Sequence, residues 1–198
     1  MRIIAGRAGG IRLAVPPSGV RPTMDRVKAA IFSSLGDSVI GARVLDLFAG
    51  SGALGIEALS RGAASALFVD EDRQSIATIE KNLGKAHFQA RVRQQDVFDF
   101  LKHLSSGEKF RIIFADPPYE RAKSGERFTE KLLNNGALPQ LLEPDGIFVL
   151  EKRPGEELTK TKLWAVTREK TYGATQVLFL SAIRTCQSGS DSHSEIPQ

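Results

Sequence analysis

The run Asp116-Pro117-Pro118-Tyr119 combines a carboxylate, a stiff backbone and an aromatic ring. An exocyclic amine on an aromatic ring is a poor nucleophile because its lone pair is delocalised. Asp116 and the carbonyl of Pro117 could accept hydrogen bonds from such an amine and orient its lone pair. Tyr119 could stack on a base drawn out of its surroundings. The competing interpretation is a rigid proline turn with no chemical role.

A second candidate site begins at Asp46, in an apolar run that leads into a glycine-rich loop and then a helical pattern. Glycines let a backbone turn tightly and approach a ligand closely, and the following helix start offers free N–H groups. The spacing also matches the G-x-G-x-x-G of dinucleotide enzymes, so the glycines alone do not separate NAD from S-adenosylmethionine. The loop residues predicted to bind the cofactor are Phe48, Ala49, Gly50, Ser51, Gly52 and Gly55.

Three acids narrow the choice of cofactor. Asp46, directly before the glycine loop, would disfavour a pyrophosphate but suits the cationic amino end of a methionine. Asp70 ends the next apolar run, where a ribose-binding acid belongs. Asp96 could accept a hydrogen bond from an adenine amino group, with Val97 beside it. The structural alternatives are a loop-tethering aspartate for Asp46, a solvated charge for Asp70 and a helix N-cap for Asp96.

An α/β fold positions these residues. Apolar runs of strand length alternate with helical patterns from Arg43 to Glu151, which is the pattern of such a fold. The pattern predicts a doubly wound, Rossmann-like sheet, mostly parallel, with an antiparallel hairpin at one edge formed by Leu163–Glu169 and Thr175–Ala182. The five strands predicted to be parallel are Val44–Phe48, Ala66–Asp70, Ala90–Arg93, Arg111–Ala115 and Ile147–Leu150.

Both ends of the chain differ from this core. Arg2–Ala5 and Ile11–Val15 flank a glycine-bearing turn and predict a small β-hairpin, followed by a helix from about Thr23 to Leu35. The polar segment from residue 184 onward has little apolar content and is expected to be disordered. We therefore expect a basic N-terminal extension (1–22), a methyltransferase domain (23–183) and a tail (184–198).

Several segments together resemble the bacterial 16S rRNA guanine-N2 methyltransferases of the RsmD family, from Arg2 to about Ile183. The glycine loop and Asp116–Tyr119 are shared with DNA amino-methyltransferases, so the other segments are the specific part. The segments that carry the resemblance are Arg2–Gly6, Arg21–Thr23, Asp25–Val27, Leu45–Gly55, Glu57–Ala63 and Asp116–Tyr119.

The resemblance implies S-adenosylmethionine as methyl donor and a guanine N2 in 16S rRNA of the small ribosomal subunit as acceptor. It implies a monomer that acts on assembled or partly assembled subunits, with Thr23 and Arg26 near the methionine end of the cofactor. The sequence departs from the family pattern at Ala29, where Glu is usual, at Ser33, often Asn, and at Asp70, usually Glu. Asp70 keeps a ribose acceptor, whereas Ala29 implies different contacts around the N-terminal segment.

Basic residues gather in the first 28 positions, where Asp25 is the one acid. Phosphate binding is a simple explanation, and a merely soluble basic surface is the alternative. A weaker second group, Lys123, Arg127 and Lys131, follows Tyr119. The residues predicted to bind RNA are Arg2, Arg7, Arg12, Arg21 and Lys28.

Other functions stay open at this stage: a DNA adenine or cytosine amino-methyltransferase, an NAD-linked oxidoreductase, or a binding protein that kept the cofactor without catalysis. Composition is ordinary, with 198 residues and a formal net charge of +4. The single cysteine, Cys186, excludes a disulfide framework and favours a reducing cytoplasm. No apolar run approaches the length of a membrane span or forms a signal peptide, so a cytoplasmic protein is expected.

Overall fold

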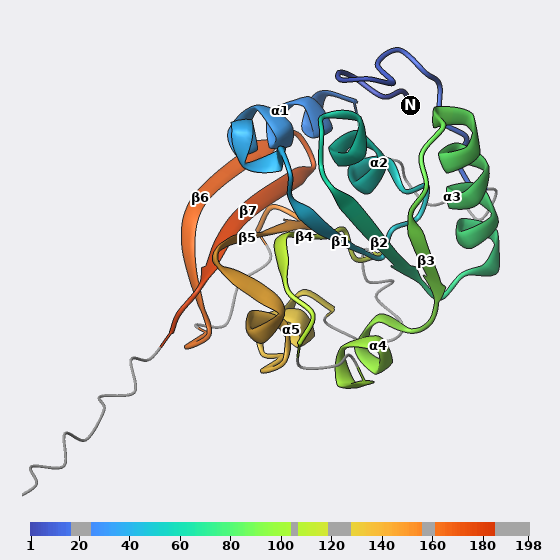
Figure 1. Ribbon diagram of the computed structural model, residues 1–198. Helices are drawn as coiled ribbons and strands as arrows, with labels where there is room; N and C mark the ends of the chain where they lie inside the picture. Colours follow the sequence, from blue (N-terminus) through green and yellow to red (C-terminus); the bar gives the residue numbers. More distant parts are fainter. Residues whose placement is uncertain (17–24, 104–106, 119–127, 156–160, 185–198) are drawn as a thin grey trace, which may run out of the picture.

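The computed structural model describes residues 1–16, 25–103, 107–118, 128–155 and 161–184. Its centre is a seven-stranded sheet with strand order β3-β2-β1-β4-β5-β7-β6 (Figure 1). The first five strands along the chain are parallel, and β7 and β6 are antiparallel, as the sequence predicts. The strands are β1 (Arg43–Leu47), β2 (Ser65–Asp70), β3 (Arg91–Gln94), β4 (Phe110–Ala115), β5 (Leu142–Lys152), β6 (Trp164–Tyr172) and β7 (Thr175–Ala182).

Helices cover both faces of the sheet, with α1, α2 and α3 on one face and α4 and α5 on the other (Figure 1). Because successive side chains of a strand point to opposite faces, Val44 of β1 joins the first core while Leu45 and Leu47 join the second. Strands buried on both faces are apolar almost throughout, which is why β1 was predictable. The helices are α1 (Asp25–Leu35), α2 (Ala53–Ser60), α3 (Arg73–Ala86), α4 (Val97–His103) and α5 (Phe128–Leu133), with short 3-10 turns η1 (Gly36–Val39) and η2 (Leu138–Leu141).

Several boundaries differ from the sequence prediction, most of them by one to three residues. β5 begins at Leu142 rather than Ile147, because Leu142 pairs with Phe110 before a register shift in β4. The two arms of the predicted N-terminal hairpin are joined by an antiparallel bridge between Arg2 and Arg12 and by backbone hydrogen bonds such as Ile3 N–H to the Ile11 carbonyl at 2.9 Å, and side chains of α2 hold the turn between them. Arg184, assigned to the tail, donates a hydrogen bond to the Leu142 carbonyl at 3.0 Å. The rest of the predicted tail lies outside the described residues.

The strand order reverses at β1. The chain passes from β1 to β2 and β3 on one side, then returns to β4 on the other, so the loops after β1 and β4 diverge at the carboxyl edge of the sheet. Leu47 is in register with both Val69 and Ala115, and this alignment brings the ends of β1, β2 and β4 level. Open α/β sheets bind ligands at such a switch point. In the described part of the chain, no helix has the length and apolar character needed to cross a bilayer.

Candidate cofactor and acceptor site

The loop after β1 adopts a backbone that few residues tolerate. Gly50 and Gly52 have φ values of +55° and +75°, and Phe48, which is not glycine, also has φ +55°. Left-handed conformations in non-glycine residues are uncommon and concentrate at functional sites. The Gly52 N–H donates to the Ala49 carbonyl at 2.7 Å, which closes a tight turn immediately before α2 begins at Ala53.

Gly55 has a different reason to be glycine. A Cβ at this position would lie 2.3 Å from Cε1 of Phe68 on β2. The residue therefore permits close packing of α2 against the sheet, the role of the third glycine in such loops. Gly55, one of the predicted cofactor-binding glycines, thus has a packing role, and its contact with a cofactor stays a prediction.

Asp46 is a buried carboxylate at the root of the loop. Its side chain is 2% exposed and accepts a hydrogen bond from the Gly55 N–H at 2.8 Å. Burial raises the pKa of Asp46 to about 8, with further contributions from the negative charges of Asp116 and Asp70, against the opposing effect of the Gly55 hydrogen bond. The hydrogen bond agrees with the loop-tethering interpretation, and the raised pKa marks a carboxyl that a nearby cation would ionise.

Asp70 closes the other side of the loop. Its Oδ2 accepts the Gly50 N–H at 2.8 Å and its Oδ1 accepts the Asp72 N–H at 2.9 Å. Burial raises the pKa of Asp70, while these two hydrogen bonds lower it. The carboxylate is half-buried, so it remains reachable by a ligand hydroxyl while it fixes the loop backbone.

Asp96 forms the N-cap that the sequence offered as one interpretation. Its Oδ1 accepts the Asp99 N–H at 2.8 Å, and its carbonyl accepts the Phe100 N–H at the start of α4. Val97 is buried at the first position of that helix. A carboxylate has further acceptor sites beyond one N-cap bond, so the adenine role of Asp96 stays a prediction.

Phe48, which the sequence predicts to bind the cofactor, forms an aromatic cluster with Phe98 and Phe128, two residues that the sequence analysis missed. Ring centroids are 6.1 Å apart between Phe48 and Phe98 and 5.8 Å apart between Phe48 and Phe128, while Phe98 and Phe128 stack at 6.0 Å. Phe98 follows Asp96 by two residues, which could have drawn attention to it. Nothing in the sequence connects Phe128 to this place, because it arrives from α5. Such an apolar wall suits a flat heteroaromatic ring.

Asp116 lies at the end of β4, where the sequence places it. It is half-buried and close enough to Asp46 for their charges to interact, which raises the pKa of Asp46. Pro117 is buried and Pro118 is exposed. The structure thus brings the first two residues of the proposed acceptor motif next to the glycine loop, while Tyr119 lies outside the described residues.

Lys28 does not belong to a phosphate-binding surface, and this prediction was wrong. Its side chain is fully buried, 3.2 Å from the equally buried carboxylate of Glu57, and it also donates to the Arg2 carbonyl at 2.5 Å. Burial lowers the pKa of Lys28, and the Glu57 charge opposes that shift. The residue lies on the same face of α1 as Ile31, Phe32 and Leu35, where an amine must find a buried partner.

Glu57 organises the N-terminal segment, defined here as residues 1–14. Its carboxylate accepts hydrogen bonds from the N–H groups of Ile4 and Ala5 at 2.7 and 3.1 Å, and from the Arg61 side chain at 2.8 Å. A lone glutamate in an otherwise apolar helix such as α2 is a recognisable signal of a buried ion pair. With Lys28, this one side chain joins the segment, α1 and α2.

Three of the four predicted RNA-binding arginines lie on the N-terminal segment, toward the sheet edge opposite Asp116. Arg2, Arg7 and Arg12 are exposed, and the Arg7 N–H donates to the Ser60 carbonyl at 2.8 Å. Ser60 ends α2, five positions before β2 begins at the opposite, amino-terminal edge of the sheet. Strands of this length separate the two edges by about 15–20 Å. Arg26 is exposed on α1, whereas Arg21 and Thr23 lie outside the described residues.

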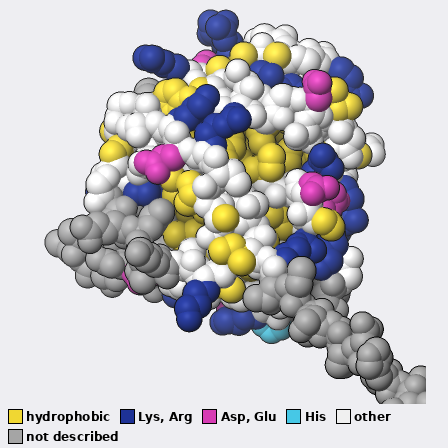
Figure 2. All heavy atoms as spheres, turned by 90° about the vertical axis from the view of Figure 1, so that its left-hand side faces the viewer, with side chains coloured by type: hydrophobic (Ala, Val, Ile, Leu, Met, Phe, Trp, Pro, Cys, Tyr) yellow, Lys and Arg dark blue, Asp and Glu magenta, His cyan; other side chains and the backbone are white. Residues whose placement is uncertain are grey.

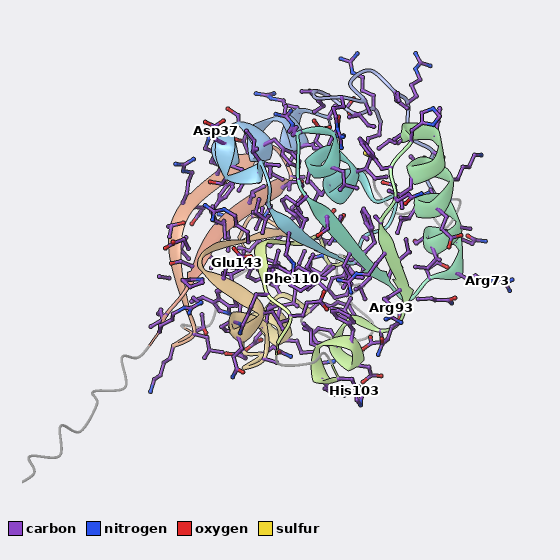
Figure 3. All side chains as sticks on the ribbon, viewed as in Figure 1. Asp37, Arg73, Arg93, His103, Phe110 and Glu143 are labelled. Atoms are coloured by element: carbon purple, nitrogen blue, oxygen red, sulfur yellow. The ribbon has the colours of Figure 1, made fainter. Side chains whose placement is uncertain are left out.

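Other basic side chains are distributed more widely. Figure 2 shows Lys and Arg around the border of the face seen from the β6 side, with apolar side chains in its middle. Arg73 at the start of α3 and Arg93 on β3 lie toward the carboxyl edge of the sheet, on the same side of the molecule as His103 (Figure 3). Both arginines are exposed. They are candidates for phosphate contacts on the β3 side of this edge that the sequence analysis did not single out.

The residues at this edge fit S-adenosylmethionine. Asp46 is a buried carboxyl, and no Lys or Arg in the described ranges forms an ion pair with it. A cationic ligand would supply the counter-charge. Asp70 offers acceptors to ribose hydroxyls, and the aromatic cluster offers an apolar wall to adenine. No group of three or more His, Cys, Asp or Glu side chains that could hold a metal ion occurs within the described residues.

Comparisons with known proteins agree with this geometry. The chain matches the family described as Conserved hypothetical protein 95 over residues 1–181. It is 43% identical to YlbH of Bacillus subtilis, with 89% of this chain and 96% of that protein covered. It is 38% identical to the Ribosomal RNA small subunit methyltransferase D of Escherichia coli, with 96% and 93% covered.

Two solved structures illustrate the fold. A Thermus thermophilus protein titled as hypothetical has a TM-score of 0.76 at 30% identity, with 91% of this chain and 99% of that chain covered. The 16S rRNA N2 G1207 methyltransferase of the same organism, solved with AdoMet and guanosine, has a TM-score of 0.60 at 23% identity, with 84% and 45% covered. At that identity the second likeness shows the fold alone.

Proposed function

Because the chain belongs to the Conserved hypothetical protein 95 family, whose RsmD-type members its sequence resembles, we propose that it methylates the exocyclic N2 amine of a guanine in 16S rRNA, with S-adenosylmethionine as donor. The observation that carries this proposal is the placement of Asp116 at the sheet's switch point, beside the buried Asp46 at the root of the glycine loop. In this proposal Asp116 contacts the methyl acceptor, and Asp46 contacts the methyl donor.

The donor side rests on three groups. Asp46, ionised by a cation, pairs with the ammonium of the methionine portion. Asp70 accepts hydrogen bonds from ribose hydroxyls while it holds the Gly50 N–H in place. Phe48, Phe98, Phe128 and Val97 would offer the adenine an apolar surface, and Asp96 is the candidate acceptor for its amino group. S-adenosylmethionine supplies an electrophilic methyl group on a positively charged sulfur.

The acceptor side rests on Asp116. Its carboxylate accepts an N–H from the guanine amine and turns the nitrogen lone pair toward the methyl group. Transfer of the methyl group would form a C–N bond on that nitrogen while the C–S bond of the donor breaks and S-adenosylhomocysteine leaves. The fixed negative charge of Asp116 would stabilise the positive charge that develops on the nitrogen, and its carboxylate or solvent would take the N–H proton that is then lost. Pro117, with φ fixed by its ring, presents its carbonyl as the second acceptor. Tyr119 stacks on the base.

The alternatives are less well supported. An NAD-linked oxidoreductase would place a doubly charged pyrophosphate beside Asp46, and burial already disfavours one negative charge there. A DNA amino-methyltransferase shares both core motifs, but the relatives named above are rRNA enzymes matched over nearly their whole length.

We further propose that the enzyme acts as a monomer in the cytoplasm on the small subunit or its assembly intermediates. The length of the match, 96% of this chain, supports a substrate like that of the relatives. The exposed arginines Arg2, Arg7 and Arg12 support contact with phosphates at a distance from the target base. Arg73 and Arg93 support contact on the β3 side of the carboxyl edge.

The proposal is tested by incubating the protein with tritiated S-adenosylmethionine and, in parallel, unmodified small subunits, total tRNA and DNA. Digestion to nucleosides identifies the polymer and the methylated atom. We expect label in N2-methylguanosine from the small subunit. Label in DNA alone, or in another atom of guanine, would overturn the proposal.

A further inference from the structure

Asn82 of α3 joins two segments that lie far apart in the sequence. Its Oδ1 accepts the Ala14 N–H at 2.8 Å, and its Nδ2 donates to the Ala14 carbonyl at 3.0 Å and to the Ser51 carbonyl at 2.9 Å. Because a backbone N–H can only donate, the Ala14 bond fixes which amide atom is oxygen. The side chain thus acts as a strand partner for residue 14 and as a clamp on the glycine loop.

Because Asn82 is buried, its contacts with Ala14 and with Ser51 depend on each other. Asn82 is 0% exposed, and both of its N–H donors are used. A buried donor that loses its acceptor has no water to replace it, so the lost bond is destabilising. If Ala14 moves away, Asn82 loses two of its three bonds, and the contact that orients the glycine loop loosens with it.

The hydrogen bond from Asn82 to the Ser51 carbonyl holds the peptide unit between Ser51 and Gly52, in the middle of the glycine loop. A peptide unit is planar, so fixing the Ser51 carbonyl also fixes the direction of the Gly52 N–H. Asp70 holds Gly50 on one side of Ser51, and the turn bond from Gly52 to Ala49 holds the other. Asn82 is the contact that connects this frame to the N-terminal segment.

The same helix holds the segment at a second point, because Lys85, one turn beyond Asn82, donates to the Arg12 carbonyl at 2.6 Å. Residues 12–14 are therefore bound to α3 through side chains, while the side chain of Arg12 stays exposed. A basic residue proposed to contact phosphate lies two positions from the residue that Asn82 grips.

We propose that Asn82 is a positioning residue that couples the N-terminal segment to the glycine loop, so that RNA held by the segment and cofactor held by the loop strengthen each other's binding. This inference rests on the proposed function. Coupling between two ligands is reciprocal, and it can be read from either side. The wild-type protein should bind RNA at least about fivefold more tightly with S-adenosylhomocysteine present, the lower end of typical coupling.

Asn82→Ala tests the coupling. In this variant we expect the RNA affinity to become independent of S-adenosylhomocysteine, and KM for S-adenosylmethionine to rise while kcat at saturation is retained. Calorimetric titration and steady-state kinetics measure both. Ser60→Ala is the matched control, because Ser60 Oγ bonds Ala5 and Ala8 of the segment at 2.6 and 3.0 Å without contacting the glycine loop. It should loosen the segment at residues 5 to 8 and, with the bonds between Asn82 and Ala14 intact, keep the cofactor affinity.

Hydrogen exchange on the wild-type protein gives a test that no variant's folding can obscure. The Ala14 amide, which donates to Asn82, should become more protected when S-adenosylhomocysteine binds. Unchanged protection together with unchanged coupling in Asn82→Ala would overturn the inference. Methyl transfer to small subunits at saturating cofactor reports on the proposed function separately, so the coupling can fail while the activity stands.

Discussion

The carboxylate of Asp46 accepts the Gly55 N–H at 2.8 Å, so the last residue but one of β1 is bonded to the first turn of α2 across the whole glycine loop. The carboxyl is buried, and Asp116 and Asp70 add negative charge nearby. A carboxyl under these conditions holds a proton at neutral pH until a cation arrives. Cofactor binding and proton release should therefore be linked.

We expect binding of S-adenosylmethionine at pH 7 to release about one proton, because the pKa of Asp46 falls from about 8 when the ammonium approaches. Calorimetric titration in buffers of different ionisation enthalpy counts that proton. Asp46→Asn serves as the control and should release none while binding the cofactor more weakly. Equal proton release by both proteins would contradict the role of Asp46.

The raised pKa of Asp46 also predicts how the free energy of unfolding depends on pH. The folded pKa of about 8 lies above the ordinary 3.8, so the folded state holds the proton more tightly than the unfolded state. The stabilisation of the folded state by the proton on Asp46 is fully present below pH 3.8 and is lost as pH rises through about 8. Urea denaturation of the cofactor-free protein at pH 6 and pH 9 should show a fall in stability that is smaller in Asp46→Asn. A fall of equal size in the variant would assign it to other groups.

Asp116→Asn should separate chemistry from cofactor binding. The amide keeps the shape but presents N–H donors toward the amine and removes the charge that stabilises the transition state. We expect the single-turnover rate to fall about 10²- to 10³-fold, as when one such interaction is lost. Affinity for S-adenosylhomocysteine should change little. A wild-type rate of transfer would show that Asp116 does not orient the amine.

Asp70→Ala should have the opposite signature. It removes the ribose acceptor and the partner of the Gly50 N–H, so we expect cofactor affinity to fall about tenfold to a hundredfold, as for a charged hydrogen bond. The rate at saturating cofactor should be retained. Asp70→Asn, which keeps an acceptor oxygen, should weaken binding less. The measurement is calorimetric titration of all three proteins, and equal affinity in Asp70→Ala would refute the assignment.

The sequence predicts the sheet well and the connections between its layers poorly. β1, β2 and β4 are apolar runs followed by punctuation, and a parallel strand buried on both faces leaves that pattern. Asp46, Asp70 and Asp116 could be found because each lies at or near the end of such a run. Phe128, by contrast, reaches the loop after β1 through tertiary packing alone, which no local pattern records.

Lys28 shows why counting charges in the sequence does not identify a surface that binds phosphate. A count of charges in the first 28 residues treats every lysine as solvated, but Lys28 shares the apolar face of α1 and meets Glu57 from α2. Only a contact between residues 29 positions apart distinguishes the buried amine from a surface one. Asn82 escaped notice for the same reason, since its partners, Ala14 and Ser51, are separated from it by 68 and 31 residues.

We expect Lys28→Met to lower the free energy of unfolding by about 3 kcal/mol, the lower end for breaking a buried pair, because Glu57 keeps Arg61 and two backbone donors. Arg2→Ala, which breaks the exposed pair with Asp25 at 3.9 Å, should cost no more than about 1 kcal/mol. Urea denaturation compares the two variants. Equal, small losses would show that the Lys28 pair contributes nothing in solution.

Removing Arg7 and Arg12 together should flatten the dependence of RNA affinity on salt. Each phosphate contact contributes about 0.7 to 0.9 to the slope of log affinity against log salt, so the double alanine variant should lose about 1.4 to 1.8. Arg168, exposed on the edge strand β6, provides the control, and Arg168→Ala should keep the slope. An unchanged slope in the double variant would move the RNA contact to other residues, with Arg73 and Arg93 the next to be tested.

The N-terminal segment is anchored almost entirely by residues that follow it at long range, and this sets an order of events during synthesis. Residues 1–14 emerge from the ribosome first, yet Glu57, Ser60 and Asn82 are translated 52 to 68 positions later. At about 5–20 residues per second the segment waits roughly 3 to 14 seconds without its partners. The segment can therefore dock fully only after α2 and α3 have been made, and the glycine loop gains its hydrogen bond from Asn82 at that same stage.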